Sequence, residues 1–307
     1  GATLLRLGNV HLAMGHLDLA RGRFEEAHDA YRRALGPHHP RVAFALDKVG
    51  SARLQASAYG PALDAHRRAL EVASEALGAE HRQTASARLN VGIALQYLGR
   101  FDEALPTLRR AVDDFRAAWG EEHPQVSFAL GGLALTLGAA GRPAEALDAY
   151  ARALAIQERA YGADHPWVAS TRHNLAESHR RLGQCADALP LYRRSRRILE
   201  AAAGDHTSRV ADTLTGEGRC VAALGDDAGA KPLLERALDL RASADPSSTR
   251  LAETRFALAR VLGAGSPRAL ELAGLAAEAY RGATERYGPQ LADVEAWLAS
   301  ADTKQPD

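Results

Sequence analysis

Apolar residues recur at helical spacing in consecutive stretches of this chain. One face of a helix forms when apolar residues follow one another at steps of three and four. The stripe over residues 84–98 consists of Ala87, Val91, Ala94, Leu95 and Leu98, and that over residues 101–118 of Phe101, Ala104, Leu105, Leu108, Ala111, Val112 and Phe115. Gly99 and Gly120 follow the two stripes and end the helices. This pattern predicts two antiparallel helices joined by a short turn.

The same helix pair is repeated along the chain with a period of 42 residues. Three kinds of marker carry the period: an alanine after the turn, a small residue seven positions later and a glycine before each copy. The first set is Ala27, Ala62, Ala104, Ala146, Ala188 and Ala230; the second is Ala34, Ala69, Ala111, Ala153, Ser195 and Ala237; the third is Gly36, Gly78, Gly120, Gly162 and Gly204. Self-similarity at one period is typical of a solenoid, so we expect an all-α solenoid of antiparallel helix pairs.

The first interval between these markers differs from the others. Ala27 and Ala62 are 35 residues apart, seven fewer than the period. Seven residues are two helical turns to within about 20°. We therefore expect one helix near the N-terminus to be shorter by two turns, with its apolar face unchanged.

Composition and charge narrow the classes of protein that need consideration. Hydrophobic residues make up 46% of the 307 residues, and 38 basic residues balance 38 acidic ones. This balance argues against a broad nucleic-acid or membrane surface, and no apolar run is long enough for a membrane span. We expect a cytoplasmic protein whose two cysteines, Cys185 and Cys220, form no disulfide.

The turn sequences resemble those of the tetratricopeptide repeat (TPR) family. Gly22-Arg23-Phe24-Glu25-Glu26-Ala27 and Gly99-Arg100-Phe101-Asp102-Glu103-Ala104 carry the likeness, together with a small residue inside each first helix. Those small residues are Gly50, Gly92, Ala134, Ala176 and Gly218. The 42-residue length and the His-Pro linkers resemble the kinesin-light-chain type, and the Arg-rich array resembles the C-terminal TPR region of bacterial Ser/Thr protein kinases.

The resemblance implies a right-handed superhelical solenoid of about seven repeats. The expected repeats lie near 2–40, 41–82, 83–124, 125–166, 167–208, 209–248 and 249–287. Residues 288–299 are expected to form a capping helix anchored by Trp297, and residues 300–307 a mobile tail.

Sequence motifs for catalysis are missing. The chain has no phosphate-binding loop, no His-Glu-x2-His motif and no Gly-x-Ser-x-Gly motif. His39, His81, His123 and His165 lie one repeat apart, roughly 20 Å, so they cannot share a metal ion. We expect these histidines to begin helices, and we expect no cofactor, no metal site and no enzymatic activity.

The family resemblance implies a concave groove lined by the first helices, which holds a peptide or helix of a partner protein. The expected groove residues are Lys48, Gln55, Asn90, Gln96, Tyr97, His173, Asn174, Glu177, Arg180 and Arg219. Asn90 and Asn174 match the asparagine that in the family often holds a peptide backbone, because one amide side chain both donates and accepts. Gly131, Gly132 and Leu135 form a smooth patch in the same groove.

Two functional hypotheses follow. The first is a non-catalytic protein–protein interaction scaffold, and the second is the regulatory or substrate-recruiting arm of a larger bacterial signalling enzyme. A kinase, a signalling ATPase or a caspase-like protease would supply the catalytic domain of that enzyme. The chain begins within a repeat pattern, which favours the second hypothesis; the oligomeric state stays open.

Two charged features have two interpretations each. Glu217 takes a position that Val49, Val91, Leu133 and Leu175 fill in other repeats. We expect a loosened, partly exposed repeat there, and the alternative is a buried carboxylate paired with an Arg of the neighbouring repeat. The basic run 193–197 is expected to be mainly solvated surface, and the alternative is a site for a phosphate or an acidic partner.

Overall fold

The structure is a computed structural model that describes residues 1–202, 207–244 and 249–302. Over these ranges it consists of helices and turns without a strand, which confirms the all-α prediction. The marker Gly204 and most of the predicted tail, residues 303–307, lie outside the described ranges. Searched over the same ranges, the helices include none that is long and apolar enough to cross a membrane.

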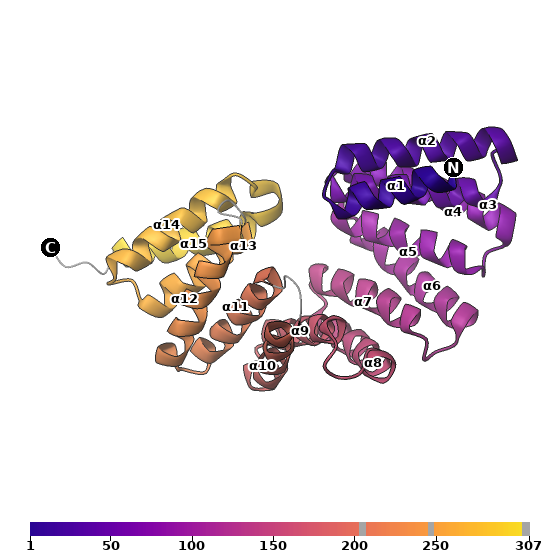
Figure 1. The fold of residues 1–307 in the computed structure, drawn as a ribbon. Coiled ribbons are helices and arrows are strands. Elements are labelled where there is room, and N and C mark those ends of the chain that lie inside the picture. The colour runs from indigo at the N-terminus through magenta and orange to yellow at the C-terminus, as the bar shows by residue number, and fades with distance from the viewer. Residues whose placement is uncertain (203–206, 245–248, 303–307) are drawn as a thin grey trace. The chain divides into compact units, whose positions relative to one another are not determined.

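The helices divide between two units, unit 1 (residues 1–160) and unit 2 (residues 161–307). Figure 1 shows that within each unit the helices alternate between a first and a second helix of a pair. In and around unit 1 the helices are α1 (Ala2–Ala13), α2 (Leu17–Leu35), α3 (Pro40–Gln55), α4 (Tyr59–Leu77), α5 (Arg82–Tyr97), α6 (Phe101–Trp119), α7 (Pro124–Ala139) and α8 (Pro143–Tyr161). Unit 2 contains α9 (Pro166–Arg181), α10 (Cys185–Ala201), α11 (Thr207–Ala223), α12 (Asp227–Ala244), α13 (Thr249–Leu262), α14 (Pro267–Arg281) and α15 (Thr284–Asp302).

The 42-residue period extends to the first repeat, so the prediction of a shortened helix is wrong. Helix α2 has 19 residues, as many as α4 and α6. Ala20, not Ala27, takes the position of Ala62, and the Gly22–Ala27 motif lies inside α2 rather than at its turn. Ala27 resembles Ala62 in the sequence because a shift of seven residues keeps the same helix face inward. Ala20 and Ala27 are both fully buried.

The turn within each repeat uses one residue with a left-handed backbone conformation. This residue recurs every 42 positions as Gly15, Ser57, Gly99, Gly141, Gly183 and Gly225. Ser57, with φ 59°, is the one non-glycine residue with positive φ in the described part of the chain. A side chain with a Cβ is strained in this conformation, so Ser57 marks a suboptimal turn.

The linker between repeats ends at a histidine that begins the next helix, as the sequence predicts. Nδ1 of His39, His81, His123 and His165 accepts a hydrogen bond from the backbone N–H two residues further on, at 3.1–3.2 Å. These contacts cap the N-termini of α3, α5, α7 and α9 by satisfying an otherwise unpaired donor.

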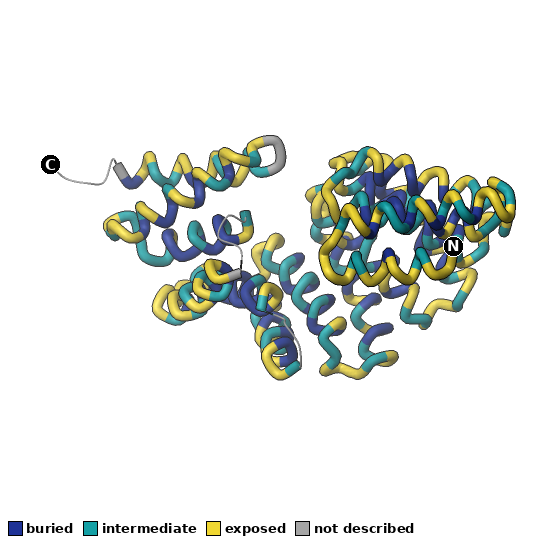
Figure 2. The backbone as a smooth tube through the Cα atoms, turned by 45° about the horizontal axis from the view of Figure 1, so that its top comes forward, coloured by how far each residue is buried: buried dark blue, intermediate teal, exposed yellow. Residues whose placement is uncertain are grey.

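Each repeat is held together by a large side chain packed on a small residue. The large residues lie on the second helices at Phe24, His66, Leu108, Tyr150, Tyr192 and Leu234, all nearly inaccessible to solvent. The small residues lie on the first helices, sixteen positions earlier, at Gly8, Gly50, Gly92, Ala134, Ala176 and Gly218. A Cβ added at Gly50 would lie 2.6 Å from the His66 ring, and one at Gly92 would lie 2.5 Å from Leu108. Figure 2 shows the buried residues following the inner side of successive helices.

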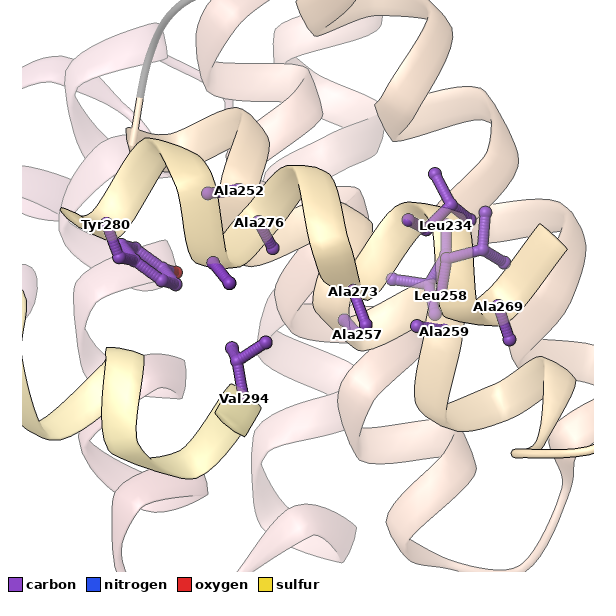
Figure 3. Packing of buried hydrophobic residues seen from close by; sticks show 12 residues of the cluster. Leu234, Ala252, Ala257, Leu258, Ala259, Ala269, Ala273, Ala276, Tyr280 and Val294 are labelled. Atoms are coloured by element: carbon purple, nitrogen blue, oxygen red, sulfur yellow. The ribbon is translucent and has the colours of Figure 1, made fainter. Parts of the chain in front are cut away.

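The last three helices share one core cluster, drawn in Figure 3. Val294 of α15 is fully buried against the cluster, whose alanines Ala273 and Ala276 come from α14. Trp297 lies edge-on to Phe256, with ring centroids 6.1 Å apart. The helix expected over 288–299 thus corresponds to α15, which begins earlier and has a non-helical residue at Tyr287.

Replacing Ser57 with glycine should raise the free energy of unfolding by about 0.5–1 kcal/mol, because the strain of a left-handed residue with a side chain is relieved. Urea denaturation followed by circular dichroism measures the change. The matched control is Gly141→Ser at the equivalent turn, where a Cβ meets no neighbour. The control should lower stability by a similar amount; an unchanged or less stable Ser57→Gly variant would contradict the assignment of strain.

Candidate functional site

The first helices of successive repeats lie against one another and form the inner face of each unit. In unit 1, α3 contacts α5 and α5 contacts α7; in unit 2, α9 contacts α11 and α11 contacts α13. The residues that the sequence places in the groove all belong to these helices or to their ends. Each unit therefore has its own inner surface, and we describe the two separately.

The inner surface of unit 2 contains a cleft with a volume of about 810 Å³. Its residues come mainly from α9, α11, α13 and α15. Those with charged or aromatic side chains are Glu177, Arg180, Arg181, Arg219, Asp227, Arg250, Glu253, Phe256, Arg260, Tyr280, Tyr287 and Asp293. This set is called the unit 2 cleft below.

At the α9 end of the cleft, one carboxylate is shared by two guanidinium groups. Arg180 donates to both oxygens of Glu177, at 2.6 and 2.7 Å, and Arg181 donates to Oε1 at 3.0 Å. The buried hydroxyl of Tyr192 donates to Oε2 at 2.9 Å. Burial raises the pKa of Glu177, but the hydrogen bonds and charge of Arg180 and Arg181 outweigh it and hold the pKa well below its ordinary value.

The middle of the cleft is crossed by ion pairs between successive repeats. Arg219 of α11 pairs with Glu253 of α13. Arg250 of α13 donates to Asp212 at 3.0 Å, and the buried Arg241 pairs with the same carboxylate. Across the described ranges, no hydrogen bond or ion pair engages Arg260, whose exposed side chain lies in the last turn of α13. Arg260 is therefore a cation in the cleft that is available to a ligand.

Aromatic side chains also line the cleft. Tyr280 and Tyr287 stack with their ring centroids 5.6 Å apart, and Phe256 lies beside them in the cleft lining. Burial raises the pKa of the Tyr280 hydroxyl, with a smaller contribution from Glu253. The cleft thus combines paired arginines with aromatic rings.

His173 lies beneath the charged end of the cleft. Its ring is 5.5 Å from that of Tyr192, and Nδ1 is 3.2 Å from the hydroxyl of Thr213. Burial lowers the pKa of His173, although Asp212, Glu177 and Glu253 partly oppose the shift. The imidazole is therefore held neutral as part of the support of the cleft.

In unit 1 the predicted groove residues form smaller groups. Asn90 Nδ2 donates to Asp47 Oδ1 at 2.8 Å, and the same oxygen lies 2.9 Å from Nδ1 of the buried His66. Lys48 covers the ring of Phe44 at 5.3 Å. Asn90 therefore joins two repeats through its amide.

The remaining predicted residues of unit 1 lie at the ends of their helices. Tyr97 is exposed and stacks on Tyr59, with centroids 5.0 Å apart. Gln55 is exposed at the end of α3, and Gln96 is half-buried near the end of α5.

A second pocket, of about 320 Å³, opens on unit 1. Its lining is mostly apolar and consists of Ala43, Phe44, Asp47, Ala69, Ala73, Arg82, Gln83, Ser86, Ala87 and Trp119. The pocket exists because four alanines line the space between α3, α4 and α5. It has room for one bulky apolar side chain.

The repeat pattern of the chain matches that of a known protein family. A family model described as tetratricopeptide repeat matches residues 1–75, 59–117, 83–159, 125–201 and 175–243. The chain belongs to the tetratricopeptide repeat family. A search among curated proteins gives no match.

Solved structures similar to this TPR chain show its fold. The apo form of RapI is 17% identical, with a TM-score of 0.70, and the match covers 93% of this chain and 96% of that one. BtubC (BKLC) from P. vanneervenii is 21% identical, with a TM-score of 0.65 and coverages of 74% and 91%. Kinesin-light-chain TPR-like repeats from Podosopora anserina are also 21% identical, with a TM-score of 0.58 and coverages of 67% and 98%.

The structure brings together only part of the predicted TPR groove. Glu177, Arg180 and Arg219 line the unit 2 cleft, whereas His173 lies behind them. Asn174 is half-buried on α9, and within the described ranges its amide has no partner. Lys48, Gln55, Asn90, Gln96 and Tyr97 belong to unit 1.

The groove residues predicted from the sequence do not include the aromatic residues that line the unit 2 cleft and the unit 1 pocket. Phe256, Tyr280 and Tyr287 line the unit 2 cleft, and Phe44 and Trp119 line the unit 1 pocket. Tyr280 and Tyr287 lie outside the first-helix positions to which the groove was assigned, in α14 and at the kink of α15. Their seven-residue spacing gave no signal, because α14 ends between them and Tyr287 is itself non-helical.

Glu217 is buried and paired, so the expectation of a loosened, partly exposed repeat is wrong. Its carboxylate is 3% exposed and accepts from Arg196 at 2.9 Å and from Arg193 at 3.3 Å. Both arginines belong to α10 of the preceding repeat. Arg194 pairs with Asp164, so at least three arginines of the basic run are engaged within the protein.

The prediction that the two cysteines form no disulfide is also wrong. Cys185 and Cys220 are bonded, with their Cα atoms 5.0 Å apart, although they are 35 residues apart in sequence. The bond joins the first residue of α10 to the last turn of α11. The repeat stack alone brings the two side chains together.

The arrangement of side chains in the described ranges does not indicate a metal site. The described ranges hold no group of three or more His, Cys, Asp or Glu residues arranged to bind a metal ion. The linker histidines serve as helix caps instead.

Replacing Glu217 with leucine should change the free energy of unfolding by less than about 1 kcal/mol, or increase it, because an apolar residue of similar size can replace a buried ion pair. The released Arg193 side chain is already 55% exposed and can be solvated. Glu217→Ala should instead lower stability by about 2–4 kcal/mol, since it leaves a cavity. Urea denaturation of both variants measures the difference; equal losses would show that the charge itself is required.

Stability should fall as the pH drops below the ordinary His173 value of 6.5. The folded state disfavours protonation of this buried ring, whereas the unfolded state binds the proton freely. Lowering the pH therefore stabilises the unfolded state and reduces the free energy of unfolding. Thermal unfolding between about pH 7.5 and about pH 5.5 measures the slope for the wild type and for His173→Gln. The variant should lose part of the slope, and identical slopes in the two proteins would contradict a neutral buried His173.

Proposed function

We propose that this TPR chain is a non-catalytic protein–protein interaction scaffold and that the unit 2 cleft holds a segment of the partner. TPR repeats generally mediate protein–protein interactions, and stacked repeats offer extended surfaces for this purpose. The observation that carries the proposal is the cleft itself, which is lined by arginines of α9, α11 and α13 and by aromatic rings of α13, α14 and α15.

The chemistry of the cleft suits binding better than catalysis. Arg, Tyr and other aromatic side chains supply much of the energy at protein interfaces. Glu177 is held ionised by two arginines and is therefore a poor proton donor or acceptor near neutral pH. The raised pKa values of Tyr192 and Tyr280 likewise make their hydroxyls poor nucleophiles.

The paired arginines give the cleft a preformed shape. Arg180 is held by a bidentate contact to Glu177, and Arg219 is held by Glu253. Side chains that are already ordered lose less conformational entropy when a partner binds. Arg260 is left to contact a carboxylate or a carbonyl oxygen of the partner.

The unit 1 pocket fits the same proposal as a second contact. Its alanine-lined space accepts one apolar side chain of the partner. Arg82 and Asp47 also line the pocket and can contact polar groups of the partner. A bacterial, cytoplasmic signalling role and the arm-of-an-enzyme hypothesis stay predictions, which the full reading frame and the cellular location test directly.

Peptides selected from a random library displayed on phage against the intact chain test the proposal. Fluorescence polarisation then measures the affinity of a selected peptide for the wild type and for Arg260→Ala. We expect the variant to bind at least about fivefold more weakly, a loss of about 1 kcal/mol.

The matched control is Arg197→Ala, which removes an exposed arginine of α10 outside the cleft lining. The control should bind as the wild type does. Unchanged affinity in Arg260→Ala and in Arg219→Ala, for every selected peptide, would move binding away from the unit 2 cleft.

A further inference from the structure

The Cys185–Cys220 disulfide lies at the wall of the unit 2 cleft. Cys185 is part of the cleft lining, as are its neighbour Gly183 and the residues Ala222 and Ala223 that follow Cys220. Cys220 is fully buried, and Cys185 is 6% exposed. A reagent in the cleft therefore reaches the bond from the Cys185 side.

Cys185 occupies a position that is aromatic in two other repeats. Phe101 stands there two repeats earlier and Tyr59 three repeats earlier, whereas the intervening repeat has Pro143. The turn motif Gly-Arg-Phe at 99–101 reads Gly-Gln-Cys at 183–185. The core around the bond contains Ala176, Ala188 and Tyr192, with Leu189 and Leu191 packed against it. Without the bond, a small thiol would stand at a position that is aromatic in two other repeats.

The other end of the α10–α11 pair is held independently. Ile198 and Leu199 of α10 pack with Val210 and Leu214 of α11 in one apolar cluster. Because the two helices are antiparallel neighbours, this cluster lies at the end of the pair far from the disulfide. Glu217 adds its ion pairs to α10 between the two ends. At the cleft end the disulfide is the one covalent tie, beside the apolar packing of Tyr192, Leu189 and Leu191.

We propose that the Cys185–Cys220 disulfide is a reversible redox lock on the unit 2 cleft. Closed, it fixes the start of α10 to the last turn of α11, and the cleft keeps its shape; open, that end separates and partner binding weakens. The part of this inference that concerns the partner rests on the proposed function. A cytoplasmic location would favour such reversible use, because disulfides there are usually transient.

The lock opens by exchange with a dithiol. One thiolate of the dithiol attacks Cys185 Sγ, the Cys185–Cys220 bond breaks, and Cys220 Sγ leaves as a thiolate that takes up a proton. The second thiol of the dithiol then attacks the mixed disulfide and releases Cys185 as a thiol. Two electrons and two protons pass to the protein, and the dithiol becomes a cyclic disulfide.

Partner binding and the redox state should be linked in both directions. A partner that fills the cleft covers Cys185 and slows attack on it. At equilibrium, a closed bond that strengthens partner binding is itself stabilised against reduction by the partner, by the same factor. The two effects give two separate measurements.

The first experiment follows backbone amide hydrogen exchange of the full chain, oxidised in air or reduced with dithiothreitol. Reduction should speed exchange at the end of α9, the start of α10 and the end of α11. Helices α3–α6 of unit 1 serve as the internal control and should not change. The double variant Cys185→Ser/Cys220→Ser should match the reduced protein in both buffers.

The second experiment measures a phage-selected peptide against both redox forms by fluorescence polarisation. Reduction should weaken binding at least about fivefold, the lower end of allosteric coupling, and the double serine variant should show no redox response. Bound peptide should slow the reduction of the disulfide, measured by maleimide labelling and mass spectrometry.

The possible outcomes separate the lock from the proposed function. Full maleimide labelling of both cysteines in the air-oxidised native protein, or identical exchange in the two redox forms, overturns the lock. Altered exchange with equal peptide affinity overturns its control of binding and leaves the scaffold proposal standing. If no selected peptide binds either form, the proposed function fails, while altered exchange still supports the mechanical lock.

Discussion

The close approach of two helices within each repeat depends on a bulky side chain seated on a residue with little or no side chain. The side chains of His66, Leu108 and Leu234 occupy the space beside Gly50, Gly92 and Gly218. A Cβ atom added at any of these glycines would collide with them. Close packing of this kind tolerates few changes in volume. It explains why the period of the chain is kept at 42 residues although the surface sequences differ from repeat to repeat. His66 fills one of these core positions with a polar ring, and Asp47 compensates by lying against its Nδ1.

Unit 2 adds a second kind of contact between repeats, made by buried or half-buried charges. Glu217 reaches back to α10, Asp212 joins α12 and α13, and Glu253 meets Arg219 across the cleft. Pairs of this kind contribute little net stability, because desolvation offsets the attraction between the charges. Their directional bonds instead hold particular side chains in place. The same groups that join the repeats thus order the arginines of the cleft, so that the architecture and the candidate binding surface share one network.

The candidate binding surface is consequently a product of the stack rather than of any single repeat. The unit 2 cleft is lined by residues of seven helices, α9 to α15. A ligand there would contact groups whose positions depend on three successive repeat interfaces. One of these interfaces carries the covalent bond between Cys185 and Cys220, so the geometry of the cleft is tied to a bond that chemistry can open.

The amino-acid sequence by itself determined the helix pairs, their period, the histidine caps and the small residues of the first helices, because each depends on local spacing along the chain. It left the register of the first repeat ambiguous, since Ala20 and Ala27 lie on one face and a shift of seven residues alters nothing local. Packing in three dimensions was needed to show that Glu217 is buried, that the two cysteines bond and that Phe256, Tyr280 and Tyr287 line one cleft with Arg219. These contacts join residues many positions apart, and whether such side chains meet depends on how the helices pack in space.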